Sequence, residues 1–283
     1  MSIGTSHLAI GATLGALALS SAGAAPATAD VPFVADPSAR NVTTYGSTAA
    51  WSRRAPDGYR LVVARGGRIA DAPVPAASEP YDPDLGPTKA NGRTIVYARG
   101  GDLYRLDVGA RAERKLTALS TAAAETAPSF FKETIVFART SGARTGLYLS
   151  RPGRSLTRVF RSAAAETDVA ETRIIGRFGR GARSIVRVMN MGADDVRIVA
   201  RARTGQRLTS PTLTRFNGIW LRAGATESRV ETVGVNAHRG LEVRTADRAL
   251  PGRVSSLASY RIPTLYTTDG GVQRIEPKLR FDR

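Results

Sequence analysis

An internal repeat constrains the fold of this chain more than any other feature of its sequence. The segment TIVYARGGDLYRL, residues 94–106, has a near copy 40 residues later in TIVFARTSGARTGLYLS, residues 134–150. Both copies contain a strand-like apolar run, then Ala-Arg, then a second run that begins with Leu-Tyr. Periods of this length are typical of propellers, solenoids and other arrays. The fold must therefore contain one structural unit several times.

Two further segments recur in the same register. A connector reads AASEP, then AAAET, then AAAET again, and its glutamates Glu79, Glu125 and Glu166 are spaced by 46 and 41 residues. An outer segment reads RKLT at 114–117 and RSLT at 154–157. A central aromatic extends the register to six units, with spacings of 46, 40, 41, 42 and 46 residues. The six aromatic positions are Trp51, Tyr97, Phe137, Phe178, Trp220 and Tyr266.

Each unit contains several short runs rich in Val, Ile, Leu and Tyr, which turn residues separate. No amphipathic helix of three turns follows residue 30. Four antiparallel strands in a unit of about 42 residues form the blade of a propeller. We therefore predict an all-β, six-bladed β-propeller over residues 30–283, with blades at about 40–77, 78–120, 121–162, 163–206, 207–250 and 251–283. The central aromatics should pack between adjacent blades, because a blade cannot bury both faces alone.

The second unit resembles the repeat of TolB-type six-bladed β-propellers. In GRTIVYARGGDLYRLDVGARAERKLT, an aromatic-ended strand precedes a turn, a Leu-Tyr-x-x-Asp strand, a polar turn and x-x-Leu-Thr. The matching positions are Tyr97, Leu103, Tyr104, Asp107, Leu116 and Thr117. The family's Pro-x-Trp-Ser-Pro-Asp-Gly signature is present only in scrambled form, as WSRRAPDG at residues 51–58. The resemblance implies the fold and a secreted or periplasmic location, and it implies no particular activity.

The best-known member of that family works with a translocation partner through an extra N-terminal domain. Here residues 1–29 are expected to be a signal peptide: they carry no Asp, Glu, Lys or Arg, are apolar or small over residues 8–19, and end in Ala-x-Ala sites near Ala25 and Ala29. A buried N-terminal helix is the alternative. The apolar run is too short for a membrane anchor, and the chain has no cysteine for lipidation or disulfides. About ten residues would then precede the first blade, so we expect no room for the extra domain.

The charge of the chain favours anionic partners without specifying one. There are 41 Lys and Arg residues against 24 Asp and Glu, a net charge of +17. A basic surface attracts polyanions, but proteins that read nucleic acid usually concentrate charge in a stripe or tail. Here the arginines are spread from Arg40 to Arg283. We therefore expect no specific nucleic-acid binding, and we retain an electrostatic binder of anionic wall polymer as one alternative.

The chain offers few catalytic motifs. His238 is the only histidine after the leader, in a turn-like NAHRG, and no Gly-x-Ser-x-Gly elbow accompanies it. Cys, His and carboxylate residues are not spaced for zinc, and no phosphate loop or dinucleotide fingerprint is present. These absences favour a non-catalytic protein.

One acidic constellation stands out. Glu79, Glu125 and Glu166 precede the presumed innermost strands of successive units, a place that faces the mouth of a propeller channel. The aspartates that follow closely are Asp82, Asp84 and Asp168. Such a ring could hold a hard cation such as calcium through oxygen ligands, hold water, neutralise arginine side chains, or accept a basic residue of a partner. We expect the ring to line one channel mouth without a tightly held ion, and we expect no cofactor.

The leading functional prediction is a secreted, monomeric scaffold that binds a protein or cell-envelope partner on one propeller face. A calcium-dependent lactonase or lyase is an alternative of a different class. One structural detail is also predicted. VPFVAD, residues 31–36, should lie along the sixth blade beside the strand that contains Leu279 and Phe281, because a ring must join its last blade to its first.

Overall fold

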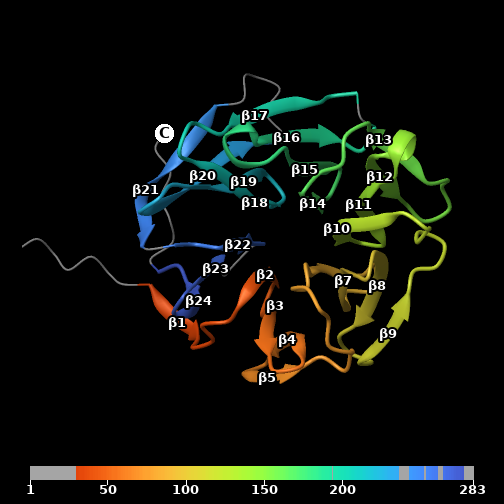
Figure 1. The fold of residues 1–283 in the computed structure, drawn as a ribbon, viewed down its shortest axis with the longest axis horizontal. Coiled ribbons are helices and arrows are strands. Elements are labelled where there is room, and N and C mark those ends of the chain that lie inside the picture. The colour runs from red at the N-terminus through yellow and green to blue at the C-terminus, as the bar shows by residue number, and fades with distance from the viewer. Residues whose placement is uncertain (1–29, 193, 236–241, 252, 261–263, 277–283) are drawn as a thin grey trace, which may run out of the picture.

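The computed structural model describes residues 30–192, 194–235, 242–251, 253–260 and 264–276, which form an all-β ring of six sheets. Each sheet has four antiparallel strands, and the sheets surround a central axis like blades (Figure 1). The helical segments in these ranges are two single 3-10 turns, Gly142–Arg144 and Gly181–Arg183. No helix within the described ranges is long and apolar enough to cross a membrane. The predicted signal peptide and His238 lie outside the described residues.

In the first five blades the four strands are consecutive in the chain and run from the axis outward. The first blade consists of β2 (Arg40–Tyr45), β3 (Thr48–Ala55), β4 (Gly58–Arg65) and β5 (Arg68–Asp71). The second consists of β6 (Asp84–Pro87), β7 (Arg93–Arg99), β8 (Asp102–Asp107) and β9 (Ala112–Lys115). The third consists of β10 (Ala124–Phe131), β11 (Thr134–Thr140), β12 (Gly146–Ser150) and β13 (Thr157–Phe160).

The fourth blade consists of β14 (Glu166–Ala170), β15 (Arg173–Phe178), β16 (Ile185–Asn190) and β17 (Arg197–Arg201). The fifth consists of β18 (Arg207–Leu213), β19 (Asn217–Ala223), β20 (Glu227–Gly234) and β21 (Val243–Pro251). The sixth consists of β22 (Ser256–Ser259), β23 (Thr264–Thr268), β24 (Gly271–Arg274) and, as its outermost strand, β1 (Val31–Val34) from the other end of the chain.

The N-terminal strand therefore closes the ring, in the blade where the sequence places it. β1 pairs antiparallel with β24, with Val31 opposite Arg274 (Figure 1). The partner strand is β24 itself, whereas Leu279 and Phe281 lie outside the described residues. Asp30, just before β1, accepts hydrogen bonds from the Tyr266 hydroxyl at 2.7 Å and the Glu276 N–H at 3.0 Å, and it pairs with the Arg248 guanidinium.

The repeated Arg-Gly-Gly segments form tight hairpins. Gly66 and Gly67 join β4 to β5 with φ of 56° and 75°, and Gly100 and Gly101 join β7 to β8 with φ of 60° and 83°. Two consecutive residues with positive φ are characteristic of the type I′ turn, which matches the twist of the strands it joins. Glycine adopts this conformation without steric cost, so the sequence folds locally into two-residue hairpins here.

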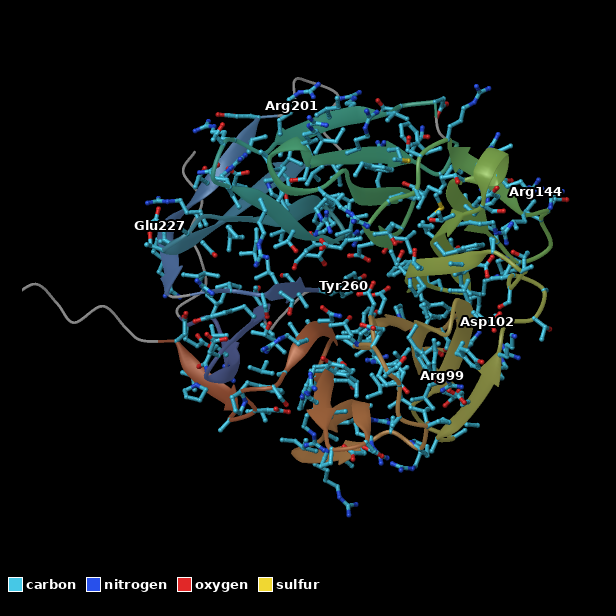
Figure 2. All side chains as sticks on the ribbon, in the orientation of Figure 1. Arg99, Asp102, Arg144, Arg201, Glu227 and Tyr260 are labelled. Carbon is cyan, nitrogen blue, oxygen red and sulfur yellow. The ribbon has the colours of Figure 1, made fainter. Side chains whose placement is uncertain are left out.

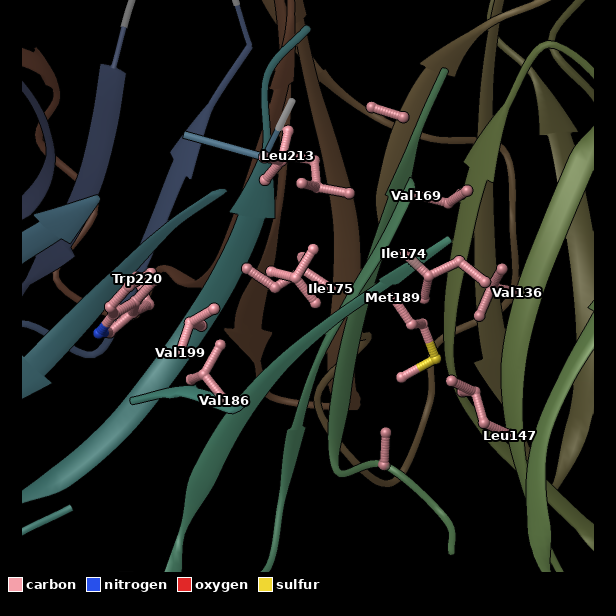
Figure 3. Close-up of a cluster of buried hydrophobic side chains, with 14 of the residues drawn as sticks. Val136, Leu147, Val169, Ile174, Ile175, Val186, Met189, Val199, Leu213 and Trp220 are labelled. Carbon is pink, nitrogen blue, oxygen red and sulfur yellow. The ribbon is translucent and has the colours of Figure 1, made fainter. Parts of the chain in front are cut away.

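Five of the six predicted central aromatics form the core between blades. Their side chains are 0–1% exposed, as expected for large rings that pack between adjacent sheets. These residues are Trp51, Tyr97, Phe137, Trp220 and Tyr266. One cluster continues across the third, fourth and fifth blades, and Figure 3 shows Val136, Ile175 and Trp220 within it. Among the described residues, each core cluster is therefore shared by neighbouring blades.

The fourth blade departs from this pattern by two residues. Strand pairing sets Ile175 opposite Asp168 and Val96 opposite Asp84, so Gly176, and not Phe178, occupies the aromatic position. A side-chain carbon added at Gly176 would lie 3.1 Å from the Phe178 ring. The ring of Phe178, which is two residues away and hence on the same face of the strand, fills the volume that the other blades fill from the central position.

Candidate functional site

The first strands of the blades line a cavity on the axis of the ring. Its volume is about 100 Å³, and every blade contributes to its wall. The lining residues are Asn41, Val42, Thr43, Asp82, Pro83, Asp84, Pro128, Glu166, Thr167, Asp168, Thr209, Ser210, Pro211, Thr212, Ser255, Ser256, Leu257 and Ala258. Hydroxyl and carboxylate groups dominate this wall, so the axis of the protein is polar.

Four carboxylates enter the cavity, all from the second and fourth blades. Asp82 lies two residues before Asp84, the first residue of β6, and Glu166 and Asp168 lie two residues apart on one face of β14. The residues that line the cavity include no Lys, Arg or His. This acidic lining contrasts with the net charge of +17 on the whole chain. The cavity is thus suited to a cationic group and unsuited to an anion.

The deeper pair of carboxylates joins neighbouring blades. Asp84 accepts a hydrogen bond from the Phe130 N–H of the third blade at 2.6 Å. Asp168 accepts one from the Leu213 N–H of the fifth blade at 2.5 Å and another from the Thr212 hydroxyl at 2.9 Å. Burial raises the pKa of Asp168 to about 6 and, together with the charge of Asp168, raises the pKa of Asp84 well above its ordinary value. These two side chains are therefore part of the ring's framework.

The outer pair behaves differently. Glu166 accepts hydrogen bonds from Thr209 and Ser210 of the fifth blade at 2.9 and 2.5 Å, and it pairs with Arg177 at 2.9 Å. Asp82 has no hydrogen-bonding or ion-pair partner among the described residues. Burial and then the charge of Glu166 raise the pKa of Asp82 to about 7, although Arg177 opposes the shift. Asp82 is thus the carboxylate at this mouth that a ligand can engage.

Aromatic side chains narrow the opposite end of the channel. There the space falls to about 20 Å³ among residues that include Tyr45, Phe131 and Tyr260. The rings of Tyr45 and Tyr260 stack with centroids 4.6 Å apart, and Phe131 lies 6.0 Å from Tyr260. Figure 2 shows Tyr260 close to the axis of the ring. The carboxylate mouth is therefore the wider opening of the two.

The three glutamates of the predicted ring are not brought together. Glu166 lines the cavity, whereas Glu79 is exposed in the connector before β6. Glu125 is fully buried away from the cavity, paired with Arg139 at 2.8 Å. An irregularity between Thr126 and Ser129 inserts one extra residue into β10. Such a bulge reverses the side to which the preceding residues point, so Glu125 does not reach the cavity, and Pro128 lines it from the third blade.

The aspartates that complete the acidic lining have a sequence signal. Asp82 and Asp84 lie in YDPDLG, and Glu166 and Asp168 lie in ETDVA. Acidic residues at i and i+2 on an innermost strand must share one face. The described residues contain no group of three His, Cys, Asp or Glu arranged to hold a metal ion. The acidic wall is thus spread along the channel, and its carboxylates do not converge on one point.

Comparison with proteins of known structure identifies the fold. No family model matches the chain, and no curated protein matches it by sequence. TolB from Acinetobacter baumannii matches in structure with a TM-score of 0.54 and 15% identity, over 81% of this chain and 64% of that one. A putative TolB from Agrobacterium tumefaciens matches with a TM-score of 0.57 and 10% identity, over 87% and 90% of the two chains. The chain has the six-bladed fold of TolB-type propellers.

The same architecture occurs in proteins with other activities. An oligogalacturonate lyase in complex with manganese matches with a TM-score of 0.51 and 10% identity, over 81% of this chain and 71% of the lyase. The present chain spans less than two thirds of the length of the Acinetobacter TolB. The TM-scores establish the common fold, and identities this low leave the activity to be argued from the site.

Proposed function

We propose that this protein is a secreted, non-catalytic scaffold that binds a protein partner on the propeller face with the acidic mouth. The observation that carries the proposal is the unpartnered Asp82 carboxylate at the opening of a cavity whose lining residues bear four carboxylates and no cation. A lysine or arginine side chain, or a free amino group, would supply the missing positive charge. A buried ion pair of this kind favours one partner orientation over others.

A matched pair of charge reversals tests this proposal. Asp82→Lys places a cation in the mouth, where Glu166 can pair with it, and should block the site. Glu79→Lys makes the same charge change on an exposed residue outside the cavity. Immobilised wild-type protein and both variants would be incubated with an envelope extract, and bound proteins identified by mass spectrometry. We expect one partner to be retained by wild type and Glu79→Lys and lost from Asp82→Lys; equal retention by all three would contradict the proposal.

A calcium-dependent enzyme is a second candidate, favoured by the channel carboxylates and by the fold shared with a manganese-bound lyase. Carboxylate oxygens are the ligands that calcium prefers. Under this candidate, millimolar calcium or manganese would raise the melting temperature of wild type by many degrees and leave Asp82→Asn unchanged. Under the scaffold proposal neither ion changes the melting temperature appreciably, so one thermal-shift experiment separates the two.

A further inference from the structure

A second concave surface lies at the perimeter of the ring, between the outer strands of the first and second blades. It is a groove of about 420 Å³, and both β5 and the turn between β8 and β9 border it (Figure 1). Its lining residues are Val63, Arg65, Arg68, Ile69, Ala70, Asp71, Ala72, Pro73, Leu106, Asp107, Val108, Gly109 and Arg111. None of these residues lines the axial cavity, so the groove is a separate feature.

Strand pairing turns two arginines of the first blade toward this groove. Arg65 lies directly opposite Arg68, and Val63 lies opposite Ala70, so these four side chains share one face of the β4–β5 hairpin. That face is the one toward the second blade, because Val63 packs with Leu106 and Val108 in the cluster between these two blades. The floor of the groove is therefore apolar, and two guanidinium groups stand at its rim.

The second blade supplies a third guanidinium. Arg111 belongs to the turn that joins β8 to β9, where the Asp107 carboxylate accepts a hydrogen bond from the Ala110 N–H at 2.8 Å. Arg111 itself has a φ of 55°, a conformation that few residues other than glycine adopt. The turn is thus held in a defined shape, and it sets Arg111 across the groove from the β4–β5 hairpin.

These three arginines lack internal counterions. Within the described residues, Arg65, Arg68 and Arg111 form no ion pair and no side-chain hydrogen bond, whereas Asp71, the nearby acid of β5, is paired with Arg53. Like charges directly opposite each other in a hairpin are destabilising. An anionic ligand would relieve the repulsion between Arg65 and Arg68. Guanidinium groups also bind carboxylates through two parallel hydrogen bonds.

We propose that this groove binds an acidic peptide segment of a protein partner, one that carries carboxylates beside a small apolar side chain. The apolar floor requires a ligand with apolar groups, which an inorganic polyanion does not have. β5 is the outermost strand of its blade, and no described strand pairs with its outer edge. An extended peptide laid along that edge gains main-chain hydrogen bonds, a frequent mode of peptide recognition. This site is independent of the acidic mouth and would be retained if the function proposed for the mouth were wrong.

The probe is a short fluorescent peptide with the repeat Glu-Ser-Val-Ser, whose Glu and Val side chains share one face of an extended strand; it is titrated with the whole protein and followed by anisotropy. We expect the double variant Arg65→Gln/Arg68→Gln to bind it about tenfold more weakly, since loss of a charged hydrogen bond is of that order. The control is Arg151→Gln/Arg154→Gln, which removes two exposed arginines from the turn between β12 and β13. This control loses the same charge away from the groove and should retain wild-type affinity.

Two further ligands test the chemistry of the groove. A peptide with Gln in place of Glu should lose most of the affinity, and so should one with Ser in place of Val. The proposal is overturned if both double variants weaken binding equally, because the interaction is then diffuse. It is also overturned if the Ser peptide or inorganic polyphosphate binds as tightly as the Glu-Val peptide, because the apolar floor then contributes nothing. Absence of binding by the wild-type protein overturns it as well.

Discussion

Asp82 shows how a single side chain couples the acidic mouth to the stability of the ring. Its pKa rises to about 7 from an ordinary value of 3.8, first because of burial and second because of Glu166. The folded protein therefore holds this proton more tightly than the unfolded chain. Between these two pKa values the folded state binds more protons, so stability decreases as pH rises through this range. A cation bound at the mouth would remove the same penalty.

The first prediction follows from that linkage. Asp82→Asn should raise the free energy of unfolding at pH 8 and leave it nearly unchanged at pH 4. The gain should be of the order of 2 kcal/mol, since one pKa unit corresponds to about 1.4 kcal/mol and water at the mouth screens part of the shift. Urea unfolding between pH 4 and 8 measures it, with Glu79→Gln as the exposed control. A variant whose stability falls with pH as steeply as wild type would show that Asp82 is not the titrating group.

At the scale of the strand, a single extra residue decides which side chains reach the axis. The bulge in β10 turns Glu125 into the interior, where it is fully buried and holds Arg139 at 2.8 Å, while the Thr121 hydroxyl donates to it at 2.8 Å. β14 has no such irregularity, and Glu166 and Asp168 both reach the cavity. Equivalent positions in the sequence repeat thus acquire different environments.

The second prediction tests the buried pair. Glu125→Ala leaves the Arg139 charge buried without its counterion, which should cost about 3–5 kcal/mol of stability. Glu227→Ala, which breaks the exposed pair with Arg229, should cost about 1 kcal/mol or less. Guanidinium chloride unfolding of both variants at neutral pH gives the comparison. Similar losses in the two variants would mean that the Glu125–Arg139 pair is as weak as a surface pair.

The contrast between these strands also explains what sequence could and could not predict. The period of about 40 residues predicts the blades, because every blade must bury the same two faces against its neighbours. The same period cannot predict a bulge, since an inserted residue leaves the apolar pattern on either side intact. The period alone predicts a ring of three glutamates, but the bulge and the longer connector before β6 separate its members. The period also predicts Phe178 at the central aromatic position, which Gly176 occupies in the structure. Residues 176 and 178 lie on the same face of β15, so the ring of Phe178 can fill the space beside Gly176.

At the scale of the whole molecule, the sixth blade differs from the other five because it combines strands from the two ends of the chain. Its outermost strand, β1, is held to β24 by strand pairing and not by a connecting turn. Among the described strands, β1 alone covers the outer edge of β24, and Asp30 adds contacts to Tyr266, Arg248 and the Glu276 N–H. All other blades are built from consecutive strands. Loss of β1 would expose an unpaired edge, a common origin of aggregation. The sixth blade should therefore limit the stability of the ring.

The last prediction is that removal of Asp30–Val34 destabilises the entire ring. The deletion retains Asp36, whose carboxylate accepts a hydrogen bond from the Trp51 indole at 2.9 Å, so the first blade keeps its own contacts. We expect a loss of roughly 3 kcal/mol, from several strand hydrogen bonds at about 1 kcal/mol each, together with concentration-dependent aggregation. Denaturant midpoints and light scattering measure the two effects. A truncated protein with unchanged midpoint and solubility would show that the seam does not limit stability.

A disulfide across the seam provides the complementary control, and the wild-type chain contains no cysteine that could interfere. Val31→Cys/Arg274→Cys joins directly opposed residues of β1 and β24. A disulfide that closes so long a loop should stabilise the protein by about 5 kcal/mol, whereas one across the β20–β21 hairpin at Arg229→Cys/Ala249→Cys should give about 3 kcal/mol. If the seam opens before the protein unfolds globally, the seam disulfide should also slow unfolding, because it prevents β1 from leaving the ring. The hairpin disulfide leaves β1 free to separate and should not change the unfolding rate.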